Sequence, residues 1–257
     1  MSDADDLLRS GDLDGARAAL VEAVKARPGD APTRMFLFQL LALAGEWNKA
    51  RIQLDTLARL SPEAAMLAAV YGQAIDAEAE REAVFAGTAV ARQHVASEWA
   101  DGIAQALHHA ANSRPAEAEE ARARAFDAAP DTPGVFDGYA FDWIADADAR
   151  FGPCFEAVIG GRYGLQPFDR VERIESEGPL DLRDLVWYPV QIAFRDGRSI
   201  AALLPARYPG SHLAEDGAER LTRATGWREG LGSGQHLLAL STGEERGLLS
   251  LRLLTFG

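Results

Sequence analysis

Cysteine, lysine and long hydrophobic runs are scarce in this chain of 257 residues, which has one cysteine, Cys154, and two lysines. A single cysteine excludes an internal disulfide and a cysteine-built zinc site, so nothing in the sequence indicates an oxidising compartment. No apolar stretch approaches the roughly 20 residues that cross a bilayer. The opening MSDADD carries acids where a secretory signal carries bases. We therefore expect a soluble chain in the cytoplasm.

Basic residues are also under-represented. The chain has 26 Lys and Arg against 39 Asp and Glu, which gives a formal net charge of −13 at pH 7. This balance disfavours non-specific binding to a phosphate backbone or to anionic lipid. We expect neither nucleic acid nor a membrane among the partners.

An internal repeat is the clearest feature of the first half. GDLDGARAALVEAVKARP at 11–28 realigns with GEWNKARIQLDTLARLSP at 45–62, a shift of 34 residues, which is the tetratricopeptide period. The shared glycine closes the turn between two antiparallel helices, the shared alanine lets them approach, and the shared proline stops the second helix. The pattern predicts helices at 3–10, 13–27, 32–44, 47–60, 63–85, 96–112 and 115–128.

The second half has a different texture. After AAPDTPG at 128–134, aromatic and β-branched residues replace alanine and the apolar runs shorten to strand length. The pair Asp196-Gly197 predicts a hairpin with a type I′ turn, and 214–225 predicts one short helix. Strands are expected at 139–144, 155–159, 168–174, 186–194, 199–204, 237–240 and 248–253.

These patterns together predict an α+β fold. Residues 1–135 form an all-α, tetratricopeptide-like repeat domain, and residues 136–257 form a small, mainly antiparallel, barrel-like β domain.

No catalytic or metal constellation emerges from the residues. A calcium loop starting at Asp146 would need glycine at its sixth position and a carboxylate at its twelfth, where the chain has Phe151 and Ala157. We interpret the nearby acids as Asx turns and caps that pair with Arg150 or another arginine. We therefore predict no catalytic residue, metal or cofactor.

We interpret the other polar motifs as structural rather than catalytic. Ser199 in GRSIA follows a hairpin turn rather than preceding a helix, so it does not make a nucleophile elbow. The alternating glycines of GLGSG at 230–234 indicate a flexible loop rather than a phosphate cradle. The lone Cys154 predicts a buried, inert thiol. The five histidines are expected at surface or interface positions: His94, His108, His109, His212 and His236.

Two clusters that mix charges with aromatics stay open between a ligand pocket and a structural scaffold. They are DLRDLVW at 181–187 and RYPGS at 207–211. We favour structural ion pairs, because no pairing of a histidine, cysteine or serine with a general base stands beside these clusters.

The repeats themselves predict a binding site. In a tetratricopeptide stack the first helix of each repeat lines a groove that takes a peptide or helix. The residues predicted at this groove are Met35, Gln39, Leu43, Met66, Gln73 and Asp76. Leu43 and Met66 could equally be core between repeats. An acidic groove rim would favour a ligand that carries Arg or Lys and would make binding sensitive to salt.

Several segments make the chain resemble the ImpE family, also called TagJ, accessory proteins encoded in some bacterial type VI secretion clusters. The resemblance is carried by GDLDGARAAL at 11–20, FDWIADADARFGPCFEAVIGGRY at 141–163, DLRDLVWYPVQI at 181–192 and LLPARYPGS at 203–211. It implies a cytoplasmic, non-enzymatic adaptor that binds a helix of the small, TssB-like sheath subunit. It also implies association with the ClpV-type AAA+ ATPase.

Two alternatives belong to other functional classes. One is a small-molecule-binding or enzymatic β domain regulated by the repeat module. The other is a generic repeat scaffold that clamps a partner's C-terminal carboxylate. That clamp needs basic residues in the groove, and none of the six predicted groove residues is basic.

Overall fold

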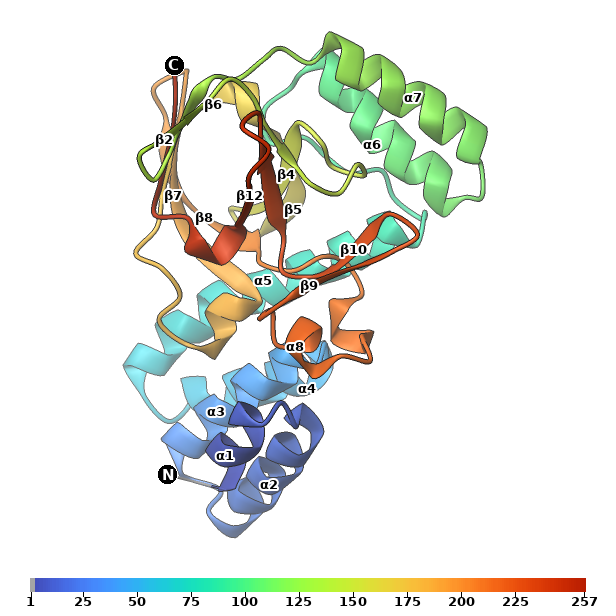
Figure 1. Cartoon of the computed structure of the whole chain (residues 1–257). Helices are drawn as coiled ribbons and strands as arrows, with labels where there is room; N and C mark the ends of the chain where they lie inside the picture. The colour runs from blue at the N-terminus through green and yellow to red at the C-terminus, as the bar shows by residue number, and fades with distance from the viewer. Residues whose placement is uncertain (1–2) are drawn as a thin grey trace.

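The computed structural model describes residues 3–257, and Figure 1 shows a helical half packed against a strand-rich half. Seven helices come first in the chain: α1 (Asp3–Arg9), α2 (Leu13–Ala26), α3 (Ala31–Leu43), α4 (Trp47–Ala58), α5 (Pro62–Phe85), α6 (Glu98–Ala111) and α7 (Pro115–Ala128). All seven helices expected from the sequence are confirmed, with ends that differ by at most two residues. Within residues 3–257, every helix is too short or too polar to span a bilayer.

Side-chain caps and glycine turns explain where the repeat helices begin and end. Asp12 accepts a hydrogen bond from the Gly15 N–H at 2.8 Å, and Ser61 accepts one from the Ala64 N–H at 3.1 Å. Gly11 and Gly45, one repeat apart, have φ angles of +89° and +70°, a left-handed conformation that other residues avoid. The 34-residue shift therefore reflects the same turn made twice.

Helix α5 is shared by the two halves. It has 24 residues, twice the 12 of α4, and in Figure 1 it runs from the N-terminal helices to the strands. Tyr71 and Ala74 pack in a cluster made mostly by α1–α5, whereas Ala77 and Val84 pack in a second cluster with α6 and with strands β4 (Cys154–Ile159) and β5 (Arg162–Pro167). The last residues of this helix thus belong to the second half.

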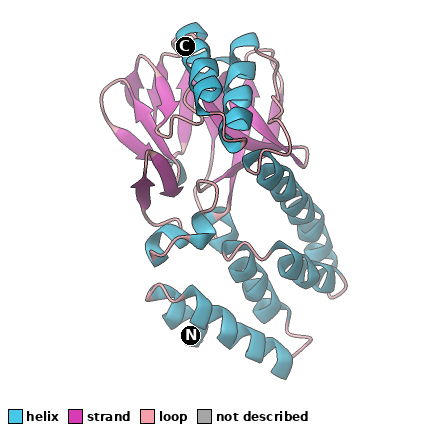
Figure 2. Cartoon of the chain, turned by 90° about the vertical axis from the view of Figure 1, so that its right-hand side faces the viewer, coloured by secondary structure: helices cyan, strands magenta, loops and turns pink. Residues whose placement is uncertain are grey.

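Helices α6 and α7 form a close pair. A side chain at Gly102 would collide with Ala125, because a Cβ there would lie 2.9 Å from the Ala125 Cβ. The pair lies across the strands in Figure 2, and Ile103 packs in one cluster with Val158 and Tyr163. These helices cover the sheet rather than extending the repeat stack away from it.

The strand-rich half is antiparallel. An eight-stranded sheet has the order β2-β1-β13-β6-β7-β8-β4-β5, and smaller sheets have the orders β12-β11-β3 and β10-β9. The strands are β1 (Gly134–Phe136), β2 (Tyr139–Phe141), β3 (Ile144–Asp146), β4 (Cys154–Ile159), β5 (Arg162–Pro167), β6 (Val171–Glu175), β7 (Trp187–Phe194), β8 (Ser199–Pro205), β9 (Thr225–Arg228), β10 (Leu231–Gly234), β11 (Leu237–Leu240), β12 (Glu245–Gly247) and β13 (Leu253–Phe256). Figure 1 shows the large sheet curving like a barrel, and its core contains Phe136, Tyr188 and Leu204. The predicted α+β fold is confirmed.

Two predicted strands are wrong. The single strand expected at 139–144 is two strands in different sheets, β2 and β3, and the Asp142 N–H between them donates to Ser241 Oγ at 2.7 Å. The strand expected at 248–253 is the short helix η4 (Leu248–Ser250), and β13 starts only at Leu253. Leu248 and Leu251 are both buried at a spacing of three, which fits a helical turn better than a strand.

The segment 211–234 also differs from expectation. The predicted helix at 214–225 is reduced to α8 (Gly217–Arg220), preceded by η3 (Ser211–Leu213). The predicted flexible loop at 230–234 is wrong, because Leu231–Gly234 is strand β10 paired with β9. Gly232 has no room for a side chain, since a Cβ there would lie 2.4 Å from the Tyr208 ring. Gly232 and Gly234 therefore allow close packing against Tyr208 and the Ala224 carbonyl.

The hairpin predicted at Asp196-Gly197 is confirmed between β7 and β8, but its turn is not type I′. A type I′ turn needs positive φ at both residues, and only Gly197, at +85°, has it. The Gly197 N–H donates to the Phe194 carbonyl at 2.9 Å.

The two halves share their hydrophobic cores. Strand β1 begins at Gly134, so the boundary predicted between residues 135 and 136 falls inside a strand. Trp187 of β7 is fully buried in the cluster formed by α1–α5, against Trp47 and Tyr71 at ring-centroid distances of 5.7 Å. The division into domains 1–135 and 136–257 therefore stays a prediction about separately folding units.

Replacing this shared indole tests how strongly the halves depend on each other. Trp187→Ala removes a fully buried ring, so we expect a loss of about 3–5 kcal/mol in the free energy of unfolding. Chemical denaturation followed by far-UV circular dichroism measures it. Trp143→Ala, at a partly exposed indole, is the matched control and should cost about 1 kcal/mol or less. Equal losses in the two variants would contradict the shared core.

Candidate functional site

The groove residues predicted on α3 are largely covered. Leu43 is fully buried and Gln39 is buried, so neither side chain can contact a partner in this fold. The prediction that these two side chains line an open groove is therefore wrong, because a partner cannot reach them. The cause is the chain itself, because the last turn of α3 lies under the segment after β8, where Arg207 Nη1 donates to the Leu43 carbonyl at 2.7 Å. Met35 is half-buried against the same cluster.

The predicted residues on α5 are exposed. Met66 is 77% exposed, and Val70, four residues later on the same face, is 51% exposed. Gln73 follows at the next turn, beside Gly161 of the β4–β5 turn. Asp76 is exposed as well and pairs with Arg51 of α4. Met66, Val70 and Gln73, which we call the α5 stripe, form an accessible and partly apolar face.

The face of α3 and α5 next to this stripe is covered by another segment of the same chain. The short helix η2 (Leu182–Leu185) packs Leu182 and Leu185 against the α1–α5 cluster. The Arg183 guanidinium lies 4.9 Å from the centroid of the Tyr71 ring, a cation–π distance. The strand-rich half thus fills a surface that open repeat proteins offer to ligands.

A buried charge network joins the two halves behind this surface. Arg81 of α5 donates from Nε and Nη2 to the two carboxylate oxygens of Glu156 on β4, at 2.8 and 2.6 Å. Tyr163 donates its hydroxyl to Glu156 Oε1 at 2.7 Å. One turn before Arg81, Glu78 accepts the Trp187 indole N–H at 2.9 Å. Bidentate geometry and full pairing are what make buried charges tolerable.

His236 extends the network into the barrel. Its Nδ1 lies 2.6 Å from Asp146 Oδ2, and its Nε2 lies 3.0 Å from Glu156 Oε2. Tyr208 donates its hydroxyl to Asp146 Oδ1 at 2.8 Å, and its ring centroid lies 4.0 Å from that of His236. The surface or interface position expected for the histidines is wrong for His236, which is buried between two carboxylates.

The two carboxylates set the protonation of the network. Burial acts to lower the pKa of His236, but the attraction of Asp146 and hydrogen bonds to both carboxylates raise it above the ordinary value. Burial acts to raise the pKa of Glu156, but Arg81 and the hydrogen bonds it receives lower it to about 2. The geometry therefore favours an imidazolium held between two carboxylates.

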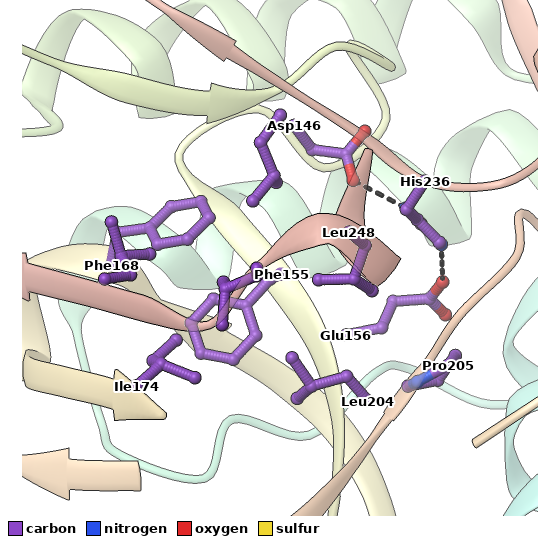
Figure 3. Close-up of a pocket in the computed structure, with 12 residues that line it drawn as sticks. Asp146, Phe155, Glu156, Phe168, Ile174, Leu204, Pro205, His236 and Leu248 are labelled. Atoms are coloured by element: carbon purple, nitrogen blue, oxygen red, sulfur yellow. Dashed lines mark hydrogen bonds and ion pairs between the residues drawn. The ribbon is translucent and has the colours of Figure 1, made fainter. Parts of the chain in front are cut away.

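The cavity beside this network is too small for a substrate. Figure 3 shows it bounded by Asp146, His236 and Glu156 on one side and by apolar side chains such as Phe155 and Phe168 on the other. Its volume is about 10 Å³, enough for about one water molecule. Among the residues that the structure describes, no group of three or more His, Cys, Asp or Glu side chains is arranged to hold a metal ion.

Other predicted polar contacts are confirmed. Arg150 pairs with Asp148 at 2.6 Å, and the Asp148 N–H donates to Asp146 Oδ1 at 2.8 Å in an Asx turn. Cys154 is buried, and burial raises the pKa of its thiol. Asp181 and Arg183 pair at 2.7 Å, as expected of a structural ion pair.

Comparison with known proteins agrees with this architecture. The sequence model of the family described as "ImpE protein" matches residues 138–255, and one described as "Tetratricopeptide repeat" matches residues 7–74. A Pseudomonas aeruginosa protein named "Type VI secretion system accessory component TagJ" is 43% identical over 256 residues, which cover 98% of this chain and 90% of that protein. The chain belongs to the ImpE/TagJ family.

The fold of this ImpE/TagJ chain also occurs in a solved structure. The crystal structure of a Vibrio parahaemolyticus protein superposes with a TM-score of 0.89, covering 100% of this chain and 98% of that one at 22% identity. The ImpE match contains Asp146, Glu156, Trp187 and His236, whereas Arg81 lies outside both matched segments. The network therefore connects the ImpE segment to the end of a helix that begins in the repeats.

Sequence reasoning missed the residues at the centre of the ImpE/TagJ chain. Glu156 stands alone among apolar residues in the strand CFEAVI, and a charged residue in a buried strand signals a buried partner. Glu78 and Arg81 carried a weaker signal, since their three-residue spacing on α5 also occurs in exposed ion pairs.

Breaking the pair between the halves should be costly. Glu156→Gln leaves the Arg81 charge buried with no carboxylate on β4, so we expect a loss of about 3–5 kcal/mol in the free energy of unfolding. Glu175→Gln, at a partly exposed residue 3.3 Å from Arg173, should cost less than about 1 kcal/mol. Urea denaturation of both variants measures the difference, and similar losses would contradict a central role for Glu156.

The protonation of His236 should make stability depend on pH. A histidine whose pKa is raised on folding stabilises the fold fully below its ordinary value of 6.5, and the stabilisation is lost as pH rises through the folded pKa. We expect the free energy of unfolding to fall as the pH rises above 6.5, with a smaller fall in His236→Gln. Urea denaturation across this range measures it. An identical slope in both proteins would show that His236 does not titrate there.

Glu156 acts in a separate window of lower pH. Its stabilisation is present above the ordinary value of 4.5 and is lost as pH falls toward about 2. The two groups are therefore distinguishable in one pH series.

Proposed function

We propose that this chain is a cytoplasmic, non-enzymatic adaptor of a type VI secretion system, which binds a helix of the small, TssB-like sheath subunit and associates with the ClpV-type AAA+ ATPase. The observation that carries the proposal is the 43% identity, over 98% of the chain, to a protein named as an accessory component of that system. The repeat match at residues 7–74 supports a role in protein–protein contact.

The α5 stripe is the surface that we propose for the sheath helix. Met66, Val70 and Gln73 are spaced so that they share one helix face, which suits the i, i+3/i+4 and i+7 anchors of an amphipathic ligand. Methionine adapts its shape to such a ligand. Met35, which is half-buried, stays a candidate at the margin of this site, whereas Gln39 and Leu43 are left out because they are covered.

The state of the titratable groups supports an adaptor more than an enzyme. Asp146, His236 and Glu156 resemble a catalytic constellation in composition, but all three are buried and His236 is hydrogen-bonded to both carboxylates, beside a cavity of about 10 Å³. A general base needs access to a substrate proton. We assign this group to stabilising the fold.

The acidic surface supports a basic partner. The formal net charge is −13, and Asp76 lies one turn beyond Gln73 on α5. A sheath helix with Arg or Lys beside its apolar face would gain attraction that salt weakens. This is the charge pattern that we expect in the bound segment.

Titration calorimetry tests the proposed site on the full chain. The ligand is a synthetic peptide covering the amino-terminal helix of the small sheath subunit from the same locus. We expect binding that is micromolar or tighter and that weakens as salt is raised. Met66→Glu combined with Val70→Glu should weaken it about tenfold or more, because both apolar anchors become charged.

A matched control separates the site from a general charge effect. Leu213 is 78% exposed, close to the 77% of Met66, so Leu213→Glu adds a charge at an equally exposed apolar position. It should leave peptide affinity unchanged. Equal weakening by both changes would reject the α5 stripe, and absence of binding to both the peptide and the purified ClpV-type ATPase would reject the adaptor function.

A further inference from the structure

A cleft of about 280 Å³ lies between the halves, apart from both the α5 stripe and the enclosed barrel cavity. It opens where the start of α4, the second half of α5 and the segment after β8 meet, a junction seen near the centre of Figure 1. Trp47 and Phe85 are among its lining residues, with His212 and Glu82. A Cβ on Gly45 would lie 2.6 Å from the His212 ring, so this edge is tightly fixed.

Two buried polar groups at the cleft have unused bonding capacity. Arg81 is 7% exposed, and its Nε and Nη2 are bonded to Glu156 and to the Arg207 carbonyl. Within residues 3–257, its Nη1 donates no hydrogen bond and only forms a 3.6 Å ion pair with Glu78 Oε2. Glu78 is 4% exposed and uses Oε1 to accept the Trp187 N–H. One donor and one acceptor thus stand side by side.

The charges around these two groups disfavour an ionic ligand. A carboxylate or phosphate bound to Arg81 Nη1 would lie against the Glu78 carboxylate and face Glu82. A cation bound to Glu78 would lie against Arg81 and near Arg207, a second buried guanidinium that lines the cleft. Like charges placed side by side repel each other, most strongly where the charged side chains are buried.

A neutral carboxamide meets both groups at once. Its carbonyl oxygen can accept from Arg81 Nη1 while its N–H donates to Glu78 Oε2, so that neither polar group is left unsatisfied. The group is planar, which suits the aromatic side chains of Trp47 and Phe85. The volume is just below the usual range of about 300–1,000 Å³ for ligand pockets, so the ligand is small.

We propose that this cleft is a binding site for a small planar carboxamide. The chemistry is shared by a free aromatic or heterocyclic amide and by a glutamine or asparagine side chain presented by a partner protein. The site is independent of the α5 stripe, so either can fail without the other.

Three isosteric probes test the chemistry on the full chain. Benzamide, benzoate and benzamidine share one ring and differ only in carrying a neutral amide, an anion or a cation. By titration calorimetry we expect benzamide to bind with a dissociation constant of about 1 mM or tighter, and the other two at least about tenfold more weakly. Equal binding of all three, tighter binding of either ion, or no binding of benzamide would overturn the proposal.

Variants locate the binding. Glu78→Gln removes the negative charge beside Arg81, so benzoate should gain and the preference for benzamide should fall about tenfold. Glu63→Gln, on the same helix but outside the cleft, should change nothing. Should Glu78→Gln fail to fold, Phe85→Leu provides a second test: it keeps an apolar side chain but removes a ring, and should weaken benzamide about threefold. Unchanged affinity in Phe85→Leu would place the probe elsewhere.

A competition experiment distinguishes the two sources. The sheath-helix peptide is titrated into the protein with and without saturating benzamide. Loss of peptide affinity would show that a partner's amide side chain uses the cleft, whereas unchanged affinity would point to a free small amide. Both results require that benzamide binds. The three-probe titrations and the variants therefore decide the proposal, and the peptide result decides only the source of the amide.

Discussion

A buried arginine on α5 joins this helix to strand β4 and to the segment after β8. The Arg81 guanidinium bonds the Glu156 carboxylate of β4 and the Arg207 carbonyl after β8, while Glu78, one turn earlier, receives the indole of Trp187. Charges withdrawn from water are tolerated only where they are paired. The fold therefore needs the arrangement of helices and strands that brings Glu156 to Arg81.

The same constraint explains why the repeats do not behave as an open groove. Just before Trp187, which reaches Glu78, the chain forms η2 and packs Leu182 and Leu185 against the α1–α5 cluster. The surface that repeat proteins usually offer to partners is thus used within the molecule. The α5 stripe and the cleft lined by Trp47 remain accessible.

The sequence predicts what local chemistry controls and fails where distant segments decide. Gly11 and Gly45 repeat a turn signal that bounds the first four helices, and the composition of 96–128 predicts the last two. Segments of three or four residues such as β2 and β10 lack the length to show a period. At the site, the sequence could not predict that Met66 is exposed and Leu43 is buried. Leu43 is covered in part by Arg207, which lies 164 residues away in sequence.

The length of α5 has a consequence for how such a chain can evolve. Repeat arrays usually gain and lose units freely, because each unit touches only its neighbours. Here α5, the first helix of the third repeat, is 24 residues long and its last turns pack against strand residues. A duplicated 34-residue unit inserted before α5 would carry α3 away from η2 and from Arg207, which bonds its last carbonyls. Selection on the junction would therefore hold the number of repeats constant.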